Sequence, residues 1–482
     1  MKLEQLLQGL EILRLEADPE LEIGDISYDS RRTKTGNAFV AVRGFQSDGH
    51  QYIGSAADNG AVAVICEQEP DCDLPYVLVP DSRLALAICS RNYFGDPGAE
   101  MTLIGVTGTN GKTTTTTLIK HMLEFVSDAK VGLIGTNRNM IGEREIETEH
   151  TTPESYELQK LLREMSDAGC THVVMEVSSH SLVLSRVAGL YFEVGVFTNL
   201  TQDHLDFHSD MDDYARAKAR LFAQCRHGAF NLDDAYAGFM RERTDCLQFC
   251  YSLGDESADL TALDVRLTAE SVDFDALYGG KLCRVEMGIP GRFSVYNALS
   301  VLSTGLLLGL ETEDCARSLK TATGVMGRVE TVSTDGDYSI VIDYAHTPDA
   351  LENVLTSMHE VTTGRLVALF GCGGDRDRTK RPKMGAIAAR IADFVIVTSD
   401  NPRTERPGDI IAEIAEGLSG SDTAHVIIED RREAIAYAIE HHLPGDVIVL
   451  AGKGHETYQI IGREKHHMDE REIVAEILAE RS

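Results

Sequence analysis

The sequence has no apolar run long enough to cross a membrane, and it lacks the basic, uninterruptedly apolar start of a secretory signal. It also lacks an excess of basic residues, because 45 Lys and Arg stand against 77 Asp and Glu, a formal charge of -32. Such a negative surface repels nucleic acid and anionic membranes. We therefore predict a cytoplasmic protein with no nucleic-acid partner and no membrane span.

No C-x-x-C pair occurs among the 10 cysteines, which we interpret as reduced, mostly buried thiols. Short internal repeats and low-complexity segments are also missing. Apolar residues make up 43% of the chain and charged residues 25%, which is ordinary for a globular protein. Domains usually contain about 100 to 200 residues, so a chain of 482 residues predicts three domains.

Two stretches predict the domain boundaries. Short apolar strands fill the first part of the chain, which ends at the turn-rich FGDPGAE, and a second boundary is expected near GVMGRVE. We predict domains at residues 1–98, 99–328 and 329–482. In the second and third, strand-like runs alternate with helical runs, the pattern of an α/β fold with mostly parallel sheets.

Four strand-like runs of the last third each end in polar or glycine-rich sequence: YSIVIDYAH, RLVALFGCGGDRD, ADFVIVTSDNPR and DVIVLAGKGHE. Ligands of open parallel sheets bind at the carboxyl ends of the strands, so these ends predict a binding edge. By turn chemistry alone, residues 399–408 (SDNPRTERPG) would instead form a solvent-exposed turn.

A phosphate-binding loop is predicted in LIGVTGTNGKTTTTTLIK, where Gly108, Gly111, Lys112 and Thr113 lie between a strand and a helix. The spacing is G-x-x-G-K-T, which is tighter than the usual phosphate loop. An ordinary glycine turn is the alternative, but a run of threonines is a poor helix former. No N-K-x-D motif for GTP appears, so we expect ATP.

A magnesium site is predicted beside this loop. Glu176 ends the strand-like VVMEVSSH and His204 follows another in FTNLTQDHLDFH, and these residue types suit Mg²⁺ bound to nucleotide phosphates. Zinc binding by His204 and His208 is an alternative, as is a pair of solvated loop histidines.

Lys218 lies just downstream, in DYARAKARLF. By spacing alone it belongs to a solvated basic face with Arg216 and Arg220. A positive lysine beside Mg²⁺ would repel the ion, so Lys218 can help only if its charge is removed or inverted. Carbamoylation by CO₂ would invert it.

Motifs spread over nearly the whole chain resemble those of the Mur ligases: GTNGKTT, HTTPES, MEVSSH, TNLTQDHLDFH, YARAKARLF, DYAHTP, GCGGDRDRTKRPKMG, SDNPR and AGKGHE. The resemblance implies an ATP-dependent amide ligase of peptidoglycan precursor synthesis, and we expect a monomer. Its three α/β domains would be an N-terminal domain for the UDP end of the substrate, a central ATP-binding domain of the P-loop ATPase type, and a C-terminal Rossmann-like domain for the amino acid. The γ-phosphate of ATP would first move onto a substrate carboxylate, and an amine would then attack the acyl phosphate.

Within the family, DNPR resembles the branch that adds meso-diaminopimelate to UDP-N-acetylmuramoyl-L-alanyl-D-glutamate, abbreviated UDP-MurNAc-dipeptide. In that branch Arg403 would bind the far carboxylate of diaminopimelate in a bidentate manner. Glu456 would bind the ammonium group beside that carboxylate. These roles are what the resemblance implies for the positions of this sequence that match.

Matched position by position, the resemblance also implies which residues form the sites. The ATP residues are Gly108, Thr109, Asn110, Gly111, Lys112, Thr113, Thr114, Asn297 and Asp343. The residues for the UDP-linked substrate are Ser30, Thr151, Thr152, Ser178 and Arg186. The amino-acid residues are Arg376, Asp400, Asn401, Pro402, Arg403, Gly452 and Glu456. The catalytic residues are Lys112, Glu176, His204 and Lys218, and the Mg²⁺ ligands are Thr113, Glu176, His204 and carbamoylated Lys218.

Two departures from the family pattern and several alternatives accompany this interpretation. Leu184 stands where close relatives often have glutamine, and Ser294 stands where the family commonly has asparagine.

The alternatives within the superfamily are the D-alanyl-D-alanine-adding ligase, folylpolyglutamate synthase and the L-lysine-adding sister, and DNPR and GKGHE argue against all three. A P-loop ATPase that is no ligase would show no amine-dependent phosphate release. A dinucleotide enzyme is disfavoured because Arg376 takes the place of the last glycine in G-x-G-x-x-G.

Overall fold

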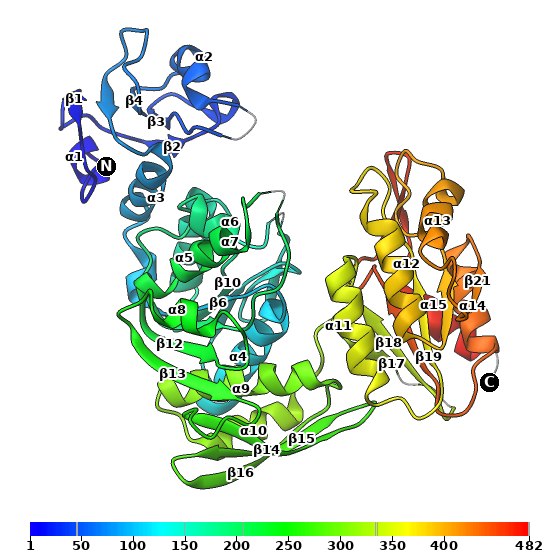
Figure 1. Ribbon diagram of the computed structural model, residues 1–482. Helices are drawn as coiled ribbons and strands as arrows, with labels where there is room; N and C mark the ends of the chain where they lie inside the picture. The colour runs from blue at the N-terminus through cyan, green and yellow to red at the C-terminus, as the bar shows by residue number, and fades with distance from the viewer. Residues whose placement is uncertain (45–46, 149, 206, 333, 335, 481–482) are drawn as a thin grey trace. The chain divides into compact units, whose positions relative to one another are not determined.

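The computed structural model describes residues 1–44, 47–148, 150–205, 207–332, 334 and 336–480, which form two compact units (Figure 1). The first unit comprises Met1–Phe230 and Asp234–Phe249, and the second comprises Asn231–Asp233 and Cys250–Ser482. The predicted three-domain α/β class with mostly parallel sheets is confirmed. The boundaries near residues 98 and 328 remain predictions. A search of the described helices finds none with the length and apolarity that a membrane span requires.

A 5-stranded sheet near the N-terminus has the order β1-β5-β4-β3-β2. Strands β2 to β5 are parallel and β1 is antiparallel to β5. Alternate residues of β3 and β4 pack against α1 and α3 on one face and α2 on the other, so both faces are buried. The elements are α1 (Leu3–Leu6), β1 (Arg14–Glu16), β2 (Asp25–Ser27), η1 (Ser30–Arg32), β3 (Asn37–Val40), η2 (Gly49–Tyr52), α2 (Ile53–Asp58), β4 (Ala63–Cys66), β5 (Tyr76–Leu78), α3 (Ser82–Tyr93) and η3 (Pro97–Glu100).

The central sheet of the first unit runs in the order β12-β11-β6-β10-β7-β8-β9. Strands β12, β11, β6, β10 and β7 are parallel, and β8 and β9 add an antiparallel hairpin. Glu176 pairs with Val106 and Phe197 pairs with Thr107, so the carboxyl ends of β10, β6 and β11 are level. This confirms that the predicted phosphate loop and Glu176 lie at neighbouring strand ends.

The elements of this central part have the following bounds: β6 (Thr102–Thr107), α4 (Lys112–Ser127), β7 (Val131–Ile134), β8 (Asn139–Ile141), β9 (Arg144–Ile146), α5 (Ser155–Asp167), β10 (His172–Glu176), α6 (Ser179–Val183), β11 (Phe192–Phe197), α7 (Met211–Ala219), η4 (Phe222–Gln224), β12 (Cys225–Asn231), α8 (Ala237–Arg241) and β13 (Leu247–Ser252).

The second unit begins with three antiparallel strands and two helices. Strand β15 (Val272–Tyr278) pairs with both β14 (Leu260–Leu267) and β16 (Lys281–Met287). Helix α9 (Arg292–Leu307) is buried along most of its length, and α10 (Thr312–Thr321) follows it.

A 6-stranded sheet follows, with the order β17-β18-β22-β19-β20-β21. All neighbours are parallel except β17 and β18. Asp343 and Phe370 both pair with Ala451, and Phe370 also pairs with Val397, so four carboxyl ends are level. The prediction that these strand ends share one edge is therefore confirmed, and ligand binding at this edge stays a prediction.

Helices cover both faces of this sheet (Figure 1). Residues of α11, α12 and α13 pack on one face, and residues of α14 and α15 pack on the other. The elements are β17 (Glu330–Val332), β18 (Ser339–Asp343), α11 (Pro348–His359), β19 (Leu366–Phe370), α12 (Lys380–Ile391), β20 (Phe394–Val397), α13 (Pro407–Glu416), β21 (Ala424–Ile427), α14 (Arg431–Glu440), β22 (Val447–Ala451), β23 (Tyr458–Ile461), β24 (Glu464–His467) and α15 (Glu470–Ala479).

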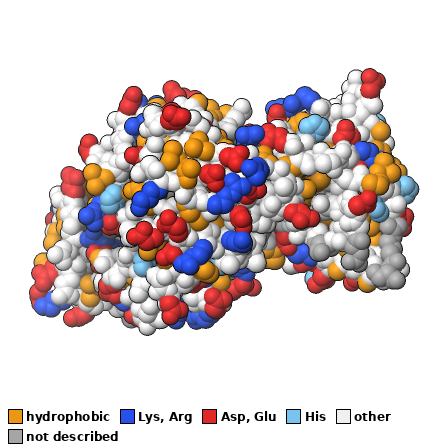
Figure 2. All heavy atoms as spheres, turned by 90° about the horizontal axis from the view of Figure 1, so that it is seen from below, with side chains coloured by type: hydrophobic (Ala, Val, Ile, Leu, Met, Phe, Trp, Pro, Cys, Tyr) orange, Lys and Arg blue, Asp and Glu red, His pale blue; other side chains and the backbone are white. Residues whose placement is uncertain are grey.

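Charged side chains are intermingled on the surface. On the face that Figure 2 shows from below, Asp and Glu are distributed across the view, with Lys and Arg between them. On this face the acidic residues, which are in excess in the sequence, are thus spread out rather than gathered in one patch.

A buried ion pair joins α14 to α15. The side chains of Arg431 and Glu470 are both 0% exposed, and Arg431 Nε donates to Glu470 Oε1 at 2.8 Å. Arg431 also donates to the carbonyl of Ala451 at 2.9 Å, at the carboxyl end of β22. The pair therefore links two helices to the edge of the sheet where the strands end.

We expect Glu470→Ala to lower the free energy of unfolding by about 3 to 5 kcal/mol, because it leaves Arg431 buried without its counter-charge. Glu476→Ala is the matched control, since Glu476 lies on the same helix and pairs with Arg432 at an exposed site. That change should cost only about 0 to 1 kcal/mol. Urea unfolding followed by circular dichroism measures both; equal losses would show that burial of the pair has no such effect.

Candidate functional site: a phosphate loop and a second strand edge

The loop between β6 and α4 has the geometry of an anion site. Gly108 has φ +154°, and a Cβ there would lie 1.9 Å from Thr198 Oγ1, so only glycine fits. Gly111 occupies the N-cap position of α4 with φ +83°, and as a glycine it has no side chain to cap the helix. The amino terminus of α4 therefore presents its backbone dipole and first-turn N–H groups toward this loop.

The threonine run after the loop forms a helix because of its surroundings. Residues 113–116 are buried within α4, and Thr116 Oγ1 and Thr117 Oγ1 donate to the Thr113 carbonyl at 3.0 and 2.8 Å. Burial and these local hydrogen bonds compensate for the poor helix propensity of threonine. The segment thus forms the first turns of a helix that begins directly after the glycine-rich loop.

Two lysines meet at one carbonyl of this loop. Lys112 Nζ donates to the carbonyls of Gly108 and Thr109 at 3.0 and 2.9 Å, and Lys218 Nζ donates to Gly108 at 2.8 Å. Lys218 is only 1% exposed, and its Nζ lies 4.5 Å from the ring centroid of Tyr214. The interpretation of Lys218 as part of a solvated face is therefore wrong.

The environment of Lys218 disfavours its ammonium form. Burial lowers the pKa of Lys218 well below its usual value, the charge of Lys112 lowers it further, and Asp203 acts in the opposite direction. A lysine in this environment gives up its proton more readily than one on the surface.

Glu176 lies at the end of β10 and is 1% exposed. Its carboxylate accepts hydrogen bonds from the N–H and the hydroxyl of Thr136 at 2.8 and 2.9 Å. A Cβ at Gly135 would lie 2.5 Å from Glu176 Oε1, so this glycine leaves the room that the carboxylate occupies.

Most of the residues predicted for the UDP-linked substrate surround Glu176. Thr151 Oγ1 lies 3.0 Å from Thr136 Oγ1, and Thr152 Oγ1 donates to the Glu176 carbonyl at 2.8 Å. Thr152 Oγ1 also lies 3.4 Å from Ser178 Oγ, and Arg186 Nη1 donates to the Thr152 carbonyl at 3.0 Å.

The remaining predicted residue of that group, Ser30, lies in η1 beside the 5-stranded sheet. There its carbonyl accepts from Asn59 Nδ2 at 2.8 Å. Leu184, one of the two departures from the family pattern, is buried directly after α6.

The two histidines after β11 have different environments. His208 is 2% exposed, with Nε2 2.9 Å from Ser179 Oγ and Nδ1 3.4 Å from Asp213 Oδ2. His204 has φ +54°, and its Nε2 lies 3.4 Å from Asp203 Oδ2. Because both ring nitrogens of His208 already have partners, the zinc alternative is not supported. Within the described ranges, no three His, Cys, Asp or Glu side chains are grouped to hold a metal ion by themselves.

The residues predicted to meet the adenosine both lie in the second unit. Asp343 ends β18 and accepts from the N–H groups of Val329 and Ala345, each at 2.8 Å, while burial raises its pKa. Asn297 is buried within α9. Ser294, the second departure from the family pattern, donates its hydroxyl to the Pro290 carbonyl at 2.7 Å.

A cluster of polar side chains occupies the carboxyl ends of β20 and β22. Asn401 Nδ2 donates to Glu456 Oε2 at 2.8 Å, and Lys453 Nζ lies 3.1 Å from the same oxygen and 3.8 Å from Asp400 Oδ1. Gly452 has φ +115°, and a Cβ there would lie 2.8 Å from Asp400 Oδ2. The structure thus brings together the predicted residues Asp400, Asn401, Gly452 and Glu456.

Arg403 adopts a backbone conformation that is unusual for a residue with a side chain. Its φ is +51°, while its N–H donates to Ile460 at 3.1 Å and its carbonyl accepts from Gly462 at 2.8 Å. The preceding residues of this segment, 399–402, are buried. The alternative of a solvent-exposed turn is therefore wrong for this part of the segment.

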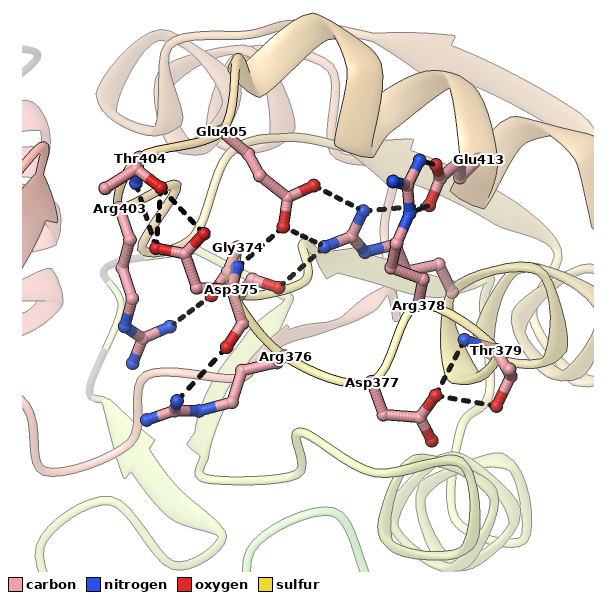
Figure 3. Close-up of polar contacts among 12 residues, drawn as sticks. Gly374, Asp375, Arg376, Asp377, Arg378, Thr379, Arg403, Thr404, Glu405 and Glu413 are labelled. Carbon is pink, nitrogen blue, oxygen red and sulfur yellow. Dashed lines mark hydrogen bonds and ion pairs between the residues drawn. The ribbon is translucent and has the colours of Figure 1, made fainter.

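Arg403 and Arg376 flank the same glycine. A Cβ at Gly373 would lie 2.9 Å from Arg403 Nη1 and 3.7 Å from Arg376 Cγ. Arg403 Nη1 also donates to the Gly374 carbonyl at 2.9 Å (Figure 3). The side chains of Arg403 and Arg376, which follow neighbouring strands, therefore both approach Gly373, Arg403 through Nη1 and Arg376 through Cγ.

Sequence reasoning missed several residues that support these sites. Lys453 is 0% exposed within AGKGHE, between two predicted residues, and that position could have indicated it. Tyr214 lies four residues before Lys218 on α7, a spacing that places both on one face. Arg381 is one of several basic residues in RDRTKRPK, and the sequence alone does not show which of them is buried.

Three family models match the chain: "Mur ligase family, catalytic domain" at residues 22–110, "Mur ligase middle domain" at residues 106–305, and "Mur ligase, glutamate ligase domain" at residues 327–454. The UDP-N-acetylmuramoyl-L-alanyl-D-glutamate--2,6-diaminopimelate ligase of Caldanaerobacter subterraneus subsp. tengcongensis is 46% identical, covering 100% of this chain and 99% of its own. Ligase 1 of the same description from Clostridium acetobutylicum is 44% identical and covers 100% of both chains.

A solved structure of a ligase with the same description is also similar. It superposes with a TM-score of 0.76 at 34% identity, covering 100% of this chain and 99% of that one. Matches of this extent, together with the phosphate loop and the second strand edge, show that the chain belongs to the Mur ligase family.

Proposed function

We propose that the protein is an ATP-dependent amide ligase that joins meso-diaminopimelate to the D-glutamate γ-carboxylate of UDP-MurNAc-dipeptide. The observation that carries this proposal is the pair of arginines over Gly373 at a strand edge that also carries Glu456. The far end of meso-diaminopimelate bears a carboxylate and an ammonium group, and these protein charges complement both. The full-length relatives named above act as ligases of 2,6-diaminopimelate, which supports this choice.

The phosphate loop would bind the phosphates of ATP. In the first step the bond from the γ-phosphorus to ADP breaks while a carboxylate oxygen of the D-glutamate bonds to that phosphorus. Lys112 would exchange the Gly108 and Thr109 carbonyls for phosphate oxygens and neutralise their charge. In the second step the amine nitrogen bonds to the acyl carbon, phosphate leaves, and the nitrogen loses a proton.

Thr113, Glu176, His204 and carbamoylated Lys218 would hold Mg²⁺ beside those phosphates. The Glu176 carboxylate, for which Gly135 leaves room, and the start of α4 after Gly111 fit such a site, and Mg²⁺ usually takes few protein ligands. When bound, Mg²⁺ neutralises phosphate charge during the transfer.

Lys218 would act as a carbamate. Its amine lies at a phosphate-loop carbonyl near Lys112, where an ammonium is repelled by that lysine and by a metal ion. A neutral amine can add to the carbon of CO₂ and lose a proton, which gives a carbamate with a negative charge. This modification would turn a repulsive group into a ligand.

The remaining assignments complete the proposal. Ser30, Thr151, Thr152, Ser178 and Arg186 would bind the UDP-linked substrate, and Asn297 and Asp343 would meet the adenosine. Asp400, Asn401, Pro402 and Gly452 would complete the amino-acid site. We further propose that the chain works in the cytoplasm as a monomer, with domains at residues 1–98, 99–328 and 329–482.

Lys112→Ala should lower the turnover number by about 100-fold to 1,000-fold, because it removes the positive charge that stabilises the γ-phosphoryl group in the transition state. ATP-dependent phosphate release measures this, and circular dichroism checks the fold. Lys160→Ala, an exposed change on α5, is the control. Near-normal ligation by a folded Lys112→Ala protein would refute the assignment of the nucleotide site.

Lys218→Ala should be almost inactive, and acetate or another short carboxylic acid should partly restore its activity by replacing the carbamate. Wild-type protein in ¹³C-bicarbonate should show a carbamate carbon signal by NMR, which Lys218→Ala should lack. Arg216→Ala, an exposed change on the same helix, should keep both signal and activity. A wild-type protein without the carbamate signal under active conditions would contradict the proposal.

Arg403→Ala should raise the KM for meso-diaminopimelate, since it removes a charge-assisted contact worth about 2 to 5 kcal/mol, roughly 30-fold or more. The KM for ATP should barely change. Arg406→Ala serves as the control, because Arg406 is exposed directly before α13. Steady-state kinetics in which Arg403→Ala keeps the wild-type KM for meso-diaminopimelate would exclude Arg403 from recognition.

A further inference from the structure

The loops that carry Arg376 and Arg403 are bonded to each other. Gly374 N donates to the Asn401 carbonyl at 2.9 Å, and Asp375 N donates to Glu405 Oε1 at 2.6 Å. Thr404 Oγ1 donates to both carboxylate oxygens of Asp375, at 2.8 and 2.9 Å (Figure 3). The loop after β19 and the loop after β20 are therefore joined by a network of hydrogen bonds.

Arg381 lies at the centre of these contacts. Its side chain is 0% exposed in the first turn of α12, and it forms two parallel hydrogen bonds to Glu405, at 2.8 and 2.9 Å. Arg381 Nη2 also donates to the Gly373 carbonyl at 3.3 Å, and Nη1 donates to Glu413 of α13 at 2.8 Å. One guanidinium group thus contacts both loops and the neighbouring helix.

The backbone around Arg381 leaves it little freedom to move. A Cβ at Gly385 would lie 2.2 Å from the Ile414 carbonyl oxygen, and a Cβ at Gly417 would lie 2.0 Å from the Pro382 carbonyl oxygen. Helices α12 and α13 therefore touch backbone to backbone, which fixes the start of α12 against α13. Arg381 and Glu413 are held at this contact.

The ion pair extends the pH range in which Glu405 is charged. The hydrogen bonds from Arg381 lower the pKa of Glu405 to about 2, so the pair persists well into the acid range. A buried guanidinium is costly to desolvate, and this cost is offset only when its donors have partners. A change in either loop would therefore be transmitted through Glu405 and Gly373 to the other.

We propose that Arg381 is a positioning residue that sets the selectivity for the amino-acid substrate by fixing Arg376 and Arg403 relative to each other across Gly373. This inference rests on the proposed function, in which these two arginines bind the far carboxylate of meso-diaminopimelate. Bidentate binding of a carboxylate requires accurate placement of the donors, and a displacement of about 1 Å can cost about 100-fold in rate. L-lysine has no carboxylate at that end, so its reaction does not depend on this placement.

The test compares Arg381→Met with the wild type, using meso-diaminopimelate and L-lysine as substrates in the ATP-dependent reaction. We expect the ratio of kcat/KM for meso-diaminopimelate to that for L-lysine to fall by about 100-fold, chiefly through the KM for meso-diaminopimelate. The kcat/KM for L-lysine and the KM for ATP should stay close to wild type. A purely structural role would instead lower both amino-acid reactions together and leave the ratio unchanged.

Arg378→Met is the matched control, because Arg378 pairs with the same Glu413 but its side chain is 66% exposed. It should leave the ratio unchanged, and a fall equal to that of Arg381→Met would overturn the proposal. If Arg381→Met does not fold, the same ratio is measured for Glu405→Gln, since this change keeps the side-chain size and removes the charge that Arg381 binds. A folded Glu405→Gln protein with the wild-type ratio would also overturn the proposal.

The wild-type measurement distinguishes a failure of the proposed function from a failure of the proposed role of Arg381. A wild type that uses L-lysine as efficiently as meso-diaminopimelate would refute the proposed function itself. A selective wild type together with an equally selective Arg381→Met would refute only the role of Arg381.

Discussion

In-register parallel pairing is the constraint on which the rest of this structure depends. Parallel strands point the same way, so wherever their last residues are level, the connecting loops emerge at one edge. Level strand ends place the phosphate loop beside Glu176 in the first unit. In the second unit they place the loops of Arg376, Arg403 and Glu456 along one edge. Residues that are far apart in the sequence therefore lie at one site, because the loops that carry them leave the sheet at the same edge.

Buried charges support both edges, and each has partners at a strand end. Lys218 donates to the phosphate loop, Lys453 lies between Asp400 and Glu456, and Arg381 joins two loops. Replacing such groups by apolar residues often does not reduce stability, so stability alone is a weak reason for their presence. Their common property is that they fix the position of groups at the two proposed sites. This explains why a protein would bear the desolvation cost.

Much of the fold and of both sites could be predicted from the sequence. The apolar runs located several strands along the chain, and glycine spacing with Lys112 and Thr113 indicated the phosphate loop, because backbone conformation and helix dipole favour those residue types there. The motif DNPR drew attention to Arg403. Local sequence patterns were sufficient to predict a feature wherever that feature depends only on neighbouring residues, as a turn or a helix start does.

The rest depends on contacts between distant segments, which periodicity does not reveal. Lys218 lies among other basic residues in the sequence, yet it is buried while Arg216 is exposed. Likewise RDRTKRPK does not distinguish the buried Arg381 from the exposed Arg378, because the packing of α12 on α13 decides it. The positive φ of Arg403 is stabilised by Ile460 and Gly462, more than fifty residues away.

The central claim is that the second edge recognises an amino acid with a carboxylate at its far end. The most direct measurement is phosphate release from ATP with UDP-MurNAc-dipeptide and a panel of amino acids that differ only at that end. We predict rapid release with meso-diaminopimelate and little with L-lysine or with a diaminopimelate whose far carboxylate is amidated. Release that is equally fast with all of them, or independent of any added amine, would contradict the account.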